Sequence, residues 1–245
     1  MKEGSEGKSS CLCRHVRSST KPTPHRCDLK RGEEEGEDLE GEMLAFFAAA
    51  RKGDLSALLR FQERHNGEAD RGLSVSIVDG YGETALHHAS FRGHYQVVEW
   101  LMEQDASLLN VPSRQEGETA VHRCCRGKKE EHVRVLQLLL DKGARLDQRD
   151  KNGLTPLHRA CYENNLHMIR VLLSKGADVR AEDKFKSHPL HWASYTNGRK
   201  DVVQLLLEHG ADATHKNDHG ETPVDNAKKF QNEELAAFYA QHLSS

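Results

Sequence analysis

One four-residue phrase recurs along the chain at nearly constant spacing. It reads Thr84-Ala85-Leu86-His87, Thr119-Ala120-Val121-His122, Thr155-Pro156-Leu157-His158 and His188-Pro189-Leu190-His191, and Thr222-Pro223-Val224-Asp225 is a weaker copy. Successive copies lie 35, 36, 33 and 34 residues apart. A period of this size predicts stacked repeats, because so short a unit cannot bury its apolar face alone.

Each unit carries the pattern of two short helices. A Thr before the first helix is a good N-cap, and Pro156 suits the first helical turn, where a missing N–H costs nothing. Leu-rich helices follow, and Gly143, Gly176 and Gly210 come where a left-handed residue ends a helix. The apolar stripe of each second helix predicts burial between neighbouring repeats.

The clearest unit runs Asp150-Lys151-Asn152-Gly153-Leu154-Thr155-Pro156-Leu157-His158-Arg159-Ala160-Cys161 and later contains Gly176-Ala177-Asp178. It resembles the ankyrin-repeat family, and the resemblance extends from about Met43 to the C-terminus. It implies an all-α repeat solenoid, in which stacked helix–turn–helix units are joined by β-hairpin-like loops. We expect about six repeats: an N-terminal cap at 43–78, internal units at 79–111, 112–148, 149–181 and 182–215, and a C-terminal cap at 216–245. Lys186 departs from the pattern by replacing the hairpin glycine, and His188 departs from it by replacing Thr.

Residues 1–42 differ in composition from the repeats. Residues 1–32 hold eight Lys or Arg against three acids, and residues 33–42 hold seven acids. Such segments lack the apolar residues that offset the entropy of ordering, so we expect a disordered tail.

The composition argues against several classes of protein. The formal net charge of −3 does not favour a dedicated nucleic-acid binder. The chain has no apolar run of the ~20 residues that span a bilayer, and no hydrophobic segment follows the N-terminal Met. Six cysteines in a chain of this kind do not read as a disulfide framework. We therefore expect a cytoplasmic or nuclear protein without a membrane partner.

The residues that could carry chemistry have structural interpretations. The repeat histidines His87, His122, His158 and His191 should form a ladder, each bonding the backbone of the adjoining hairpin, because packed helices lie ~8–10 Å apart. The same spacing places Cys125 and Cys161 too far apart for a disulfide, so we expect them to be buried, unpaired thiols. Cys11, Cys13, His15, His25 and Cys27 could ligate zinc, but their spacing matches no paired motif. We expect no metal, no cofactor and no catalytic residue, and therefore no enzyme.

The remaining candidates are surface residues. In ankyrin-like proteins the hairpin tips and the exposed side of each first helix form a concave binding face. The register places aromatic residues and arginines there, which are types enriched in binding hot spots. The predicted partner-binding residues are Tyr81, His88, Phe91, Arg123, Arg126, Arg159, Tyr162, Phe185, Trp192 and Tyr195.

The sequence therefore predicts a monomeric, non-catalytic module that binds a partner protein segment on this face. The basic bias suggests an acidic or phosphorylated segment. An alternative is an adaptor or assembly factor for a larger complex, such as a ubiquitin ligase or the proteasome. A weaker alternative is that the chain's own acidic run, residues 33–42, covers the face.

Overall fold

The computed structural model describes residues 36–65, 74–195 and 198–243. Residues 1–35 of the predicted tail lie outside these ranges. They include the cysteines and histidines that could ligate zinc. The rest of the tail belongs to a helix, because α1 begins at Gly36, before the predicted boundary at Met43.

Helices in pairs make up the described part of the chain, which contains no strand. The first helices of the pairs are α1 (Gly36–Lys52), α3 (Ala85–Arg92), α5 (Ala120–Cys125), α7 (Pro156–Tyr162), α9 (Pro189–Ala193) and α11 (Pro223–Lys229). The second helices are α2 (Leu55–His65), α4 (Tyr95–Gln104), α6 (Glu130–Asp141), α8 (Leu166–Ser174), α10 (Lys200–Glu208) and α12 (Glu233–Leu243). A 3₁₀ helix, η2 (Ala106–Asn110), follows α4. The predicted all-α repeat class is confirmed.

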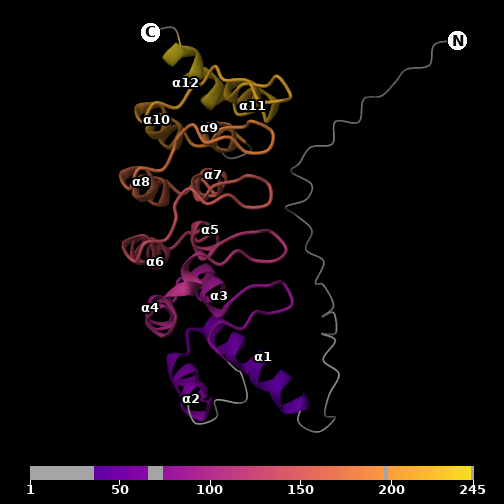
Figure 1. The fold of residues 1–245 in the computed structure, drawn as a ribbon. Coiled ribbons are helices and arrows are strands. Elements are labelled where there is room, and N and C mark those ends of the chain that lie inside the picture. Colours follow the sequence, from indigo (N-terminus) through magenta and orange to yellow (C-terminus); the bar gives the residue numbers. More distant parts are fainter. Residues whose placement is uncertain (1–35, 66–73, 196–197, 244–245) are drawn as a thin grey trace, which may run out of the picture. The chain divides into compact units, whose positions relative to one another are not determined.

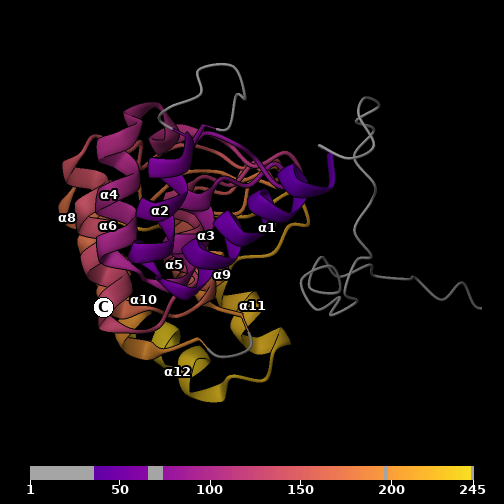
Figure 2. The same ribbon diagram turned by 90° about the horizontal axis from the view of Figure 1, so that it is seen from below.

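Successive pairs lie one above the other (Figure 1). The second helices α4, α6, α8 and α10 form one column and the first helices α3, α5, α7 and α9 form the next, while the connecting loops project to the far side. Seen along the stack, the same elements overlay one another (Figure 2). No helix in the described ranges is both long and apolar enough to cross a bilayer.

Local sequence explains where the helices begin and end. The N-cap residue is Thr before α3, α5, α7 and α11, and it is His188 before α9. Proline occupies the first turn of α7, α9 and α11. Gly176 follows α8 with φ 89°, a left-handed conformation that glycine adopts without strain.

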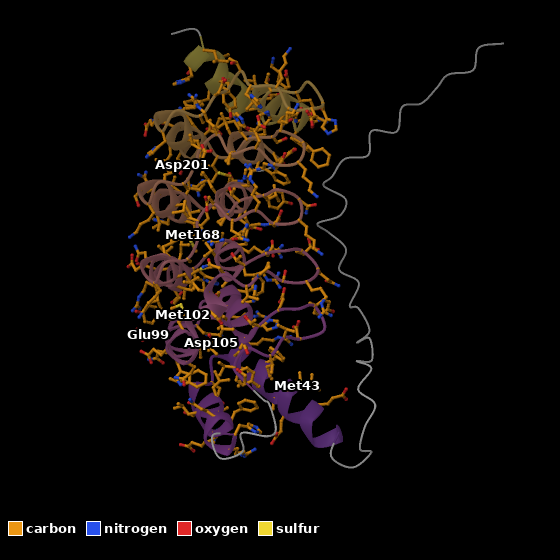
Figure 3. All side chains as sticks on the ribbon, in the orientation of Figure 1. Met43, Glu99, Met102, Asp105, Met168 and Asp201 are labelled. Carbon is orange, nitrogen blue, oxygen red and sulfur yellow. The ribbon has the colours of Figure 1, made fainter. Side chains whose placement is uncertain are left out.

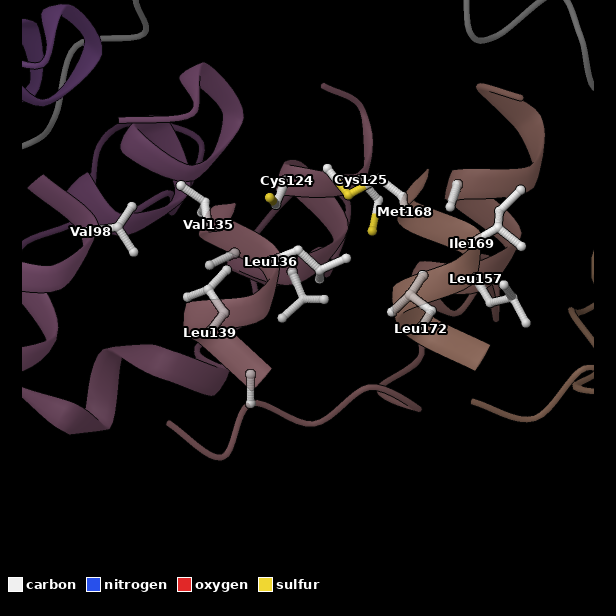
Figure 4. Packing of buried hydrophobic residues seen from close by; sticks show 14 of the residues in the cluster. Val98, Cys124, Cys125, Val135, Leu136, Leu139, Leu157, Met168, Ile169 and Leu172 are labelled. Carbon is white, nitrogen blue, oxygen red and sulfur yellow. The ribbon is translucent and has the colours of Figure 1, made fainter. Parts of the chain in front are cut away.

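The core is continuous from one repeat to the next. Val135, Leu136 and Leu139 of α6 belong to the same cluster of fully buried side chains as Met168 and Leu172 of α8, and Val135 lies beside Val98 of α4 (Figure 4). The predicted burial of the second-helix stripe is therefore confirmed, and each repeat depends on its neighbours for its core.

Candidate functional site

The loops that enter the first helices are hairpins, each closed by one polar side chain. Asp150 Oδ1 accepts the N–H groups of Asn152 and Leu154 at 2.7 and 2.9 Å, and Asp79 and Asp183 bind their own hairpins in the same way. Asn217 does so in the last repeat. Ser113 replaces the acid in the second hairpin, where its hydroxyl accepts from Glu118 N at 3.2 Å. Figure 3 shows the side chains along the whole stack, on the helices and on the hairpin loops.

The tips of neighbouring hairpins are joined through their backbones. Arg114 N donates to Tyr81 O at 3.0 Å, Lys151 N to Glu116 O at 2.8 Å, Lys184 N to Asn152 O at 3.0 Å, and Asp218 N to Phe185 O at 2.9 Å. The spacing of the tips is therefore fixed by main-chain atoms from one repeat to the next.

The repeat histidines form the predicted ladder. The backbone N–H of Thr155 donates to His158 Nδ1 at 3.1 Å, so Nε2 carries the proton and donates to Ser187 O of the next hairpin at 3.1 Å. His87, His122 and His191 make the equivalent pairs of bonds to their own N-cap residue and to the next hairpin. Burial lowers the pKa of His158 to about 3 and the pKa values of His122 and His191 to about 4. Their structural role is confirmed.

The residue after each repeat histidine connects its helix to its own hairpin. His88 Nε2 donates to Asp79 Oδ2 at 2.8 Å, Arg159 Nη2 to Asp150 Oδ2 at 3.3 Å, and Trp192 Nε1 to Asp183 Oδ2 at 2.9 Å. We call His88, Arg123, Arg159 and Trp192 the floor row. His88, Arg159 and Trp192 are 8%, 6% and 7% exposed, so most of their surface serves the protein's own packing.

Arg123 lacks such an acid, because its hairpin begins with Ser113. Its guanidinium pairs with Glu83 of the preceding repeat and with Glu118, 3.4 Å away. Glu118 is 0% exposed and also pairs with Arg126 at 2.8 Å and with Arg159 at 2.7 Å. Burial alone would raise the pKa of Glu118, but Arg159, Arg126 and Arg123 together lower it. This carboxylate therefore organises three of the predicted partner-binding residues.

A second row lies three residues further along the first helices and is half-buried. It consists of Phe91, Arg126, Tyr162 and Tyr195, which we call the inner strip. The Tyr162 and Trp192 rings lie 5.7 Å apart, those of Trp192 and Tyr195 5.4 Å apart, and both pairs meet edge to face. Arg123 lies over the Phe91 ring at 5.4 Å. The inner strip therefore rests on the floor row.

The two predicted tip residues lie outside these rows. Tyr81 and Phe185 are half-buried at their hairpin tips, and Phe185 stacks on His219 with 5.7 Å between ring centroids. The structure thus places the ten predicted residues in three settings: the floor row, the inner strip and the tips. Sequence reasoning missed Glu118, although an acid placed just before the helix that carries Arg123, in the same repeat as Arg126, was a signal in the sequence.

Two groups of potential metal ligands occur in the described ranges. In the group of Asp79, Glu83 and His88, the histidine already donates to Asp79, and the Arg51 guanidinium lies 3.6 Å from the same carboxylate. In the group of Glu182, His188 and His215, the imidazole rings stack 3.7 Å apart at 10°, so their nitrogen lone pairs lie in nearly parallel planes. In the first group the ligand atoms are thus already used in bonds within the protein, and in the second the parallel ring planes do not converge.

The cysteines of α5 and α7 are unpaired and fully buried, as predicted for Cys125 and Cys161. Burial raises the pKa of Cys125 to about 12 and also raises that of Cys161. A thiol in this state is a poor nucleophile, because the thiolate is the reactive form.

Comparison with known proteins identifies the family. A family model of ankyrin repeats matches residues 26–110, 45–149, 107–183 and 129–217. The chain belongs to the ankyrin-repeat family. Ankyrin-repeat proteins are typically non-catalytic modules that mediate protein–protein interaction, so fold and family agree with the expected class.

Among relatives of this ankyrin-repeat chain, ankyrin repeat and SOCS box protein 3 of Bos taurus is 28% identical over 74% of the chain and 33% of its own length. Human B-cell lymphoma 3 protein is 36% identical over 62% of the chain and 34% of its own length. Diacylglycerol kinase iota of Rattus norvegicus is 33% identical, but the match covers 47% of the chain and 10% of the kinase. The chain thus spans at most about a third of these relatives.

A solved structure supports the fold alone. A chain in the complex of the predatory endopeptidase Bd0816 from Bdellovibrio bacteriovorus with the immunity protein Bd3460 superposes with a TM-score of 0.66 at 23% identity. The match covers 80% of this chain and 97% of that chain.

Proposed function

We propose that this chain is a non-catalytic, monomeric interaction module that binds a segment of a partner protein along its concave face. The observation that carries the proposal is the inner strip, where Tyr162 and Tyr195 join Trp192 in a continuous aromatic cluster across two repeats. Half-buried aromatic side chains that pack on the floor row suit recognition, because they lose little side-chain freedom on binding.

The ten candidate residues take different parts in this proposal. The inner strip and the tip residues Tyr81 and Phe185 contact the partner. The floor row positions the inner strip. The polar atoms of the floor row bond to Asp79, Asp150, Asp183 and Glu118, so only its small exposed surface would contact the partner. The surface is thus formed before a partner arrives.

The proposed partner is an acidic or phosphorylated segment. Arg126 is the most exposed of the three arginines around Glu118, with 28% of its side chain exposed, and Arg123 follows with 17%. Glu118 is shared among three guanidinium groups, so Arg126 retains donors for a partner's anionic group.

An adaptor or assembly role in a larger complex is the second candidate. The observation that favours it is the match over 74% of the chain to a relative named for a SOCS box. The two candidates share the binding surface and differ in whether a bound partner is delivered to another assembly.

The test is an affinity capture with a Tyr162→Ser, Tyr195→Ser double variant and with Tyr95→Ser as the matched control. Tyr95 is also half-buried but lies on α4, in the second-helix column. We expect the double variant to lose a protein that the wild type and the control both retain, while circular dichroism shows all three folded. Equal capture by all three proteins would refute the proposed surface.

A further inference from the structure

A row of cations lies along the hairpin tips. Arg114, Lys151 and Lys184 occupy the same register position in three successive repeats, and all three side chains are exposed. In the described ranges none of them pairs with a carboxylate. Lys151 Nζ donates to the Arg114 carbonyl, which leaves its charge without a counter-ion.

This row contrasts with the arginines of the first helices. Arg123 and Arg159 each share two acids of the protein, and Arg126 shares Glu118. An incoming anion must compete there with carboxylates already in place. Arg114, Lys151 and Lys184 have no such carboxylate partner in the described part of the chain, whereas Lys186 at the tip pairs with Asp218, so these three offer the larger uncompensated charge.

The spacing of the row is fixed. The backbone N–H of each of the three residues is the donor of a tip-to-tip hydrogen bond. The glycine of each preceding hairpin keeps the tips close: a Cβ on Gly153 would lie 2.9 Å from Lys184 N, and one on Gly117 3.0 Å from Lys151 N. The three charges therefore begin from positions that the backbone sets.

The spacing defines what fits. Packed helices of neighbouring repeats lie ~8–10 Å apart. A polyproline II segment has three residues per turn and rises about 3.1 Å per residue, so every third side chain lies on the same side, ~9 Å from the last. We propose that Arg114, Lys151 and Lys184 bind a segment of the partner in the polyproline II conformation that carries a carboxylate side chain at every third residue. This inference rests on the proposed function, since it names the partner's chemistry and adds three residues to the site.

The test uses synthetic peptides and fluorescence anisotropy at low salt. The probe is a labelled 13-residue peptide with Glu at positions 4, 7 and 10 and Pro or Ser elsewhere, and the comparison peptide carries the same three Glu in adjacent positions. The wild type should bind the spaced peptide at least about fivefold more tightly, and added salt should weaken binding because screening reduces exposed charge interactions. Equal affinity for the two peptides would overturn the spacing argument.

The matched variants change charge equally at two places. Lys151→Glu with Lys184→Glu alters the tips, and Lys142→Glu with Lys175→Glu alters two exposed lysines after the second helices. The tip variant should bind the spaced peptide at least about tenfold more weakly, and the control within about threefold of wild type. Equal losses would show that only net charge matters and would overturn the proposal.

Two further arms separate this inference from the proposed function. If the Tyr162→Ser, Tyr195→Ser variant loses the captured partner while the tip variant retains it, the proposed function stands and the tip row is refuted. A single-stranded oligonucleotide that binds the tips more tightly than the spaced peptide would also overturn the assignment to a protein segment.

Discussion

The histidine ladder makes the stability of the stack sensitive to mild acid. Each buried imidazole accepts a backbone N–H at Nδ1 and donates from Nε2, as His158 does at 3.1 Å on both sides. A proton added at Nδ1 would face the backbone N–H that Nδ1 now accepts, so that hydrogen bond would be lost. The folded protein therefore resists protonation, whereas the unfolded chain takes up a proton near the ordinary pKa of about 6.5.

The sign follows from these pKa values. The folded pKa of His158 is about 3 and those of His122 and His191 are about 4, all below the unfolded value. The unfolded state thus binds more protons, so stability is fully present above pH 6.5 and is lost as the pH falls towards 4. At pH 5.5 each group costs about 1.4 kcal/mol, and the three together about 4 kcal/mol. That loss is a large part of a typical domain stability of about 5–15 kcal/mol.

Urea denaturation followed by circular dichroism at pH 7.5 and 5.5 measures this loss. The test variant is His158→Gln, because glutamine can accept from Thr155 N and donate to Ser187 O but does not titrate. It should be less stable than wild type at pH 7.5 and should lose about 1.4 kcal/mol less between the two pH values. An identical pH dependence in wild type and His158→Gln would refute the reasoning.

Three other predictions concern charge, backbone and thiols. Glu118→Gln should destabilise the protein by about 3–5 kcal/mol in urea denaturation, because it leaves three guanidinium groups without their shared buried carboxylate; a change below 1 kcal/mol would contradict this role. Lys186→Gly should stabilise the protein by about 0.5–1 kcal/mol, because Lys186 has the left-handed φ of 55° that glycine adopts without strain. Gly153→Ala should lower the melting temperature, because Gly153 has φ 80° and Lys184 N leaves no space for a Cβ. Changes of the opposite sign would show that the hairpin tips relax around the substitution. Cys125 should stay unmodified by iodoacetamide in the native protein and react in urea, as read by peptide mass spectrometry, and rapid native labelling would contradict its burial.

Much of the fold was predictable because the repeat period encodes it. The spacing of the Thr-x-x-His phrase places each first helix, and the ladder of His158 and its equivalents follows from stacking those helices. The start of α1 at Gly36 is not evident from the sequence, because the composition of the acidic run around Glu40 predicts a disordered tail. Acidic residues also suit the first turns of a helix, where they interact favourably with the helix dipole.

The candidate site was only partly predictable. The repeat register alone selects the residues that face the hairpins. It does not show which of their side chains bond to other residues of the protein. Asp79 and His88, Asp150 and Arg159, and Asp183 and Trp192 are each nine residues apart and bonded. That regular spacing was visible in the sequence, but its meaning depends on the hairpin turning its acid back onto the helix, which is a property of the fold.

The tip-to-tip bonds have a consequence for how such a surface can change. Main-chain atoms make one such bond at each step of the row, so the alignment of Arg114, Lys151 and Lys184 does not require particular side chains; the bond from Lys151 Nζ to the Arg114 carbonyl adds to it. Any of the three could be exchanged for an acid, an aromatic residue or an alanine while the next tip stays in place. For the proposed tip surface, recognition and architecture would therefore be separable, and a different partner would require new side chains but no new scaffold.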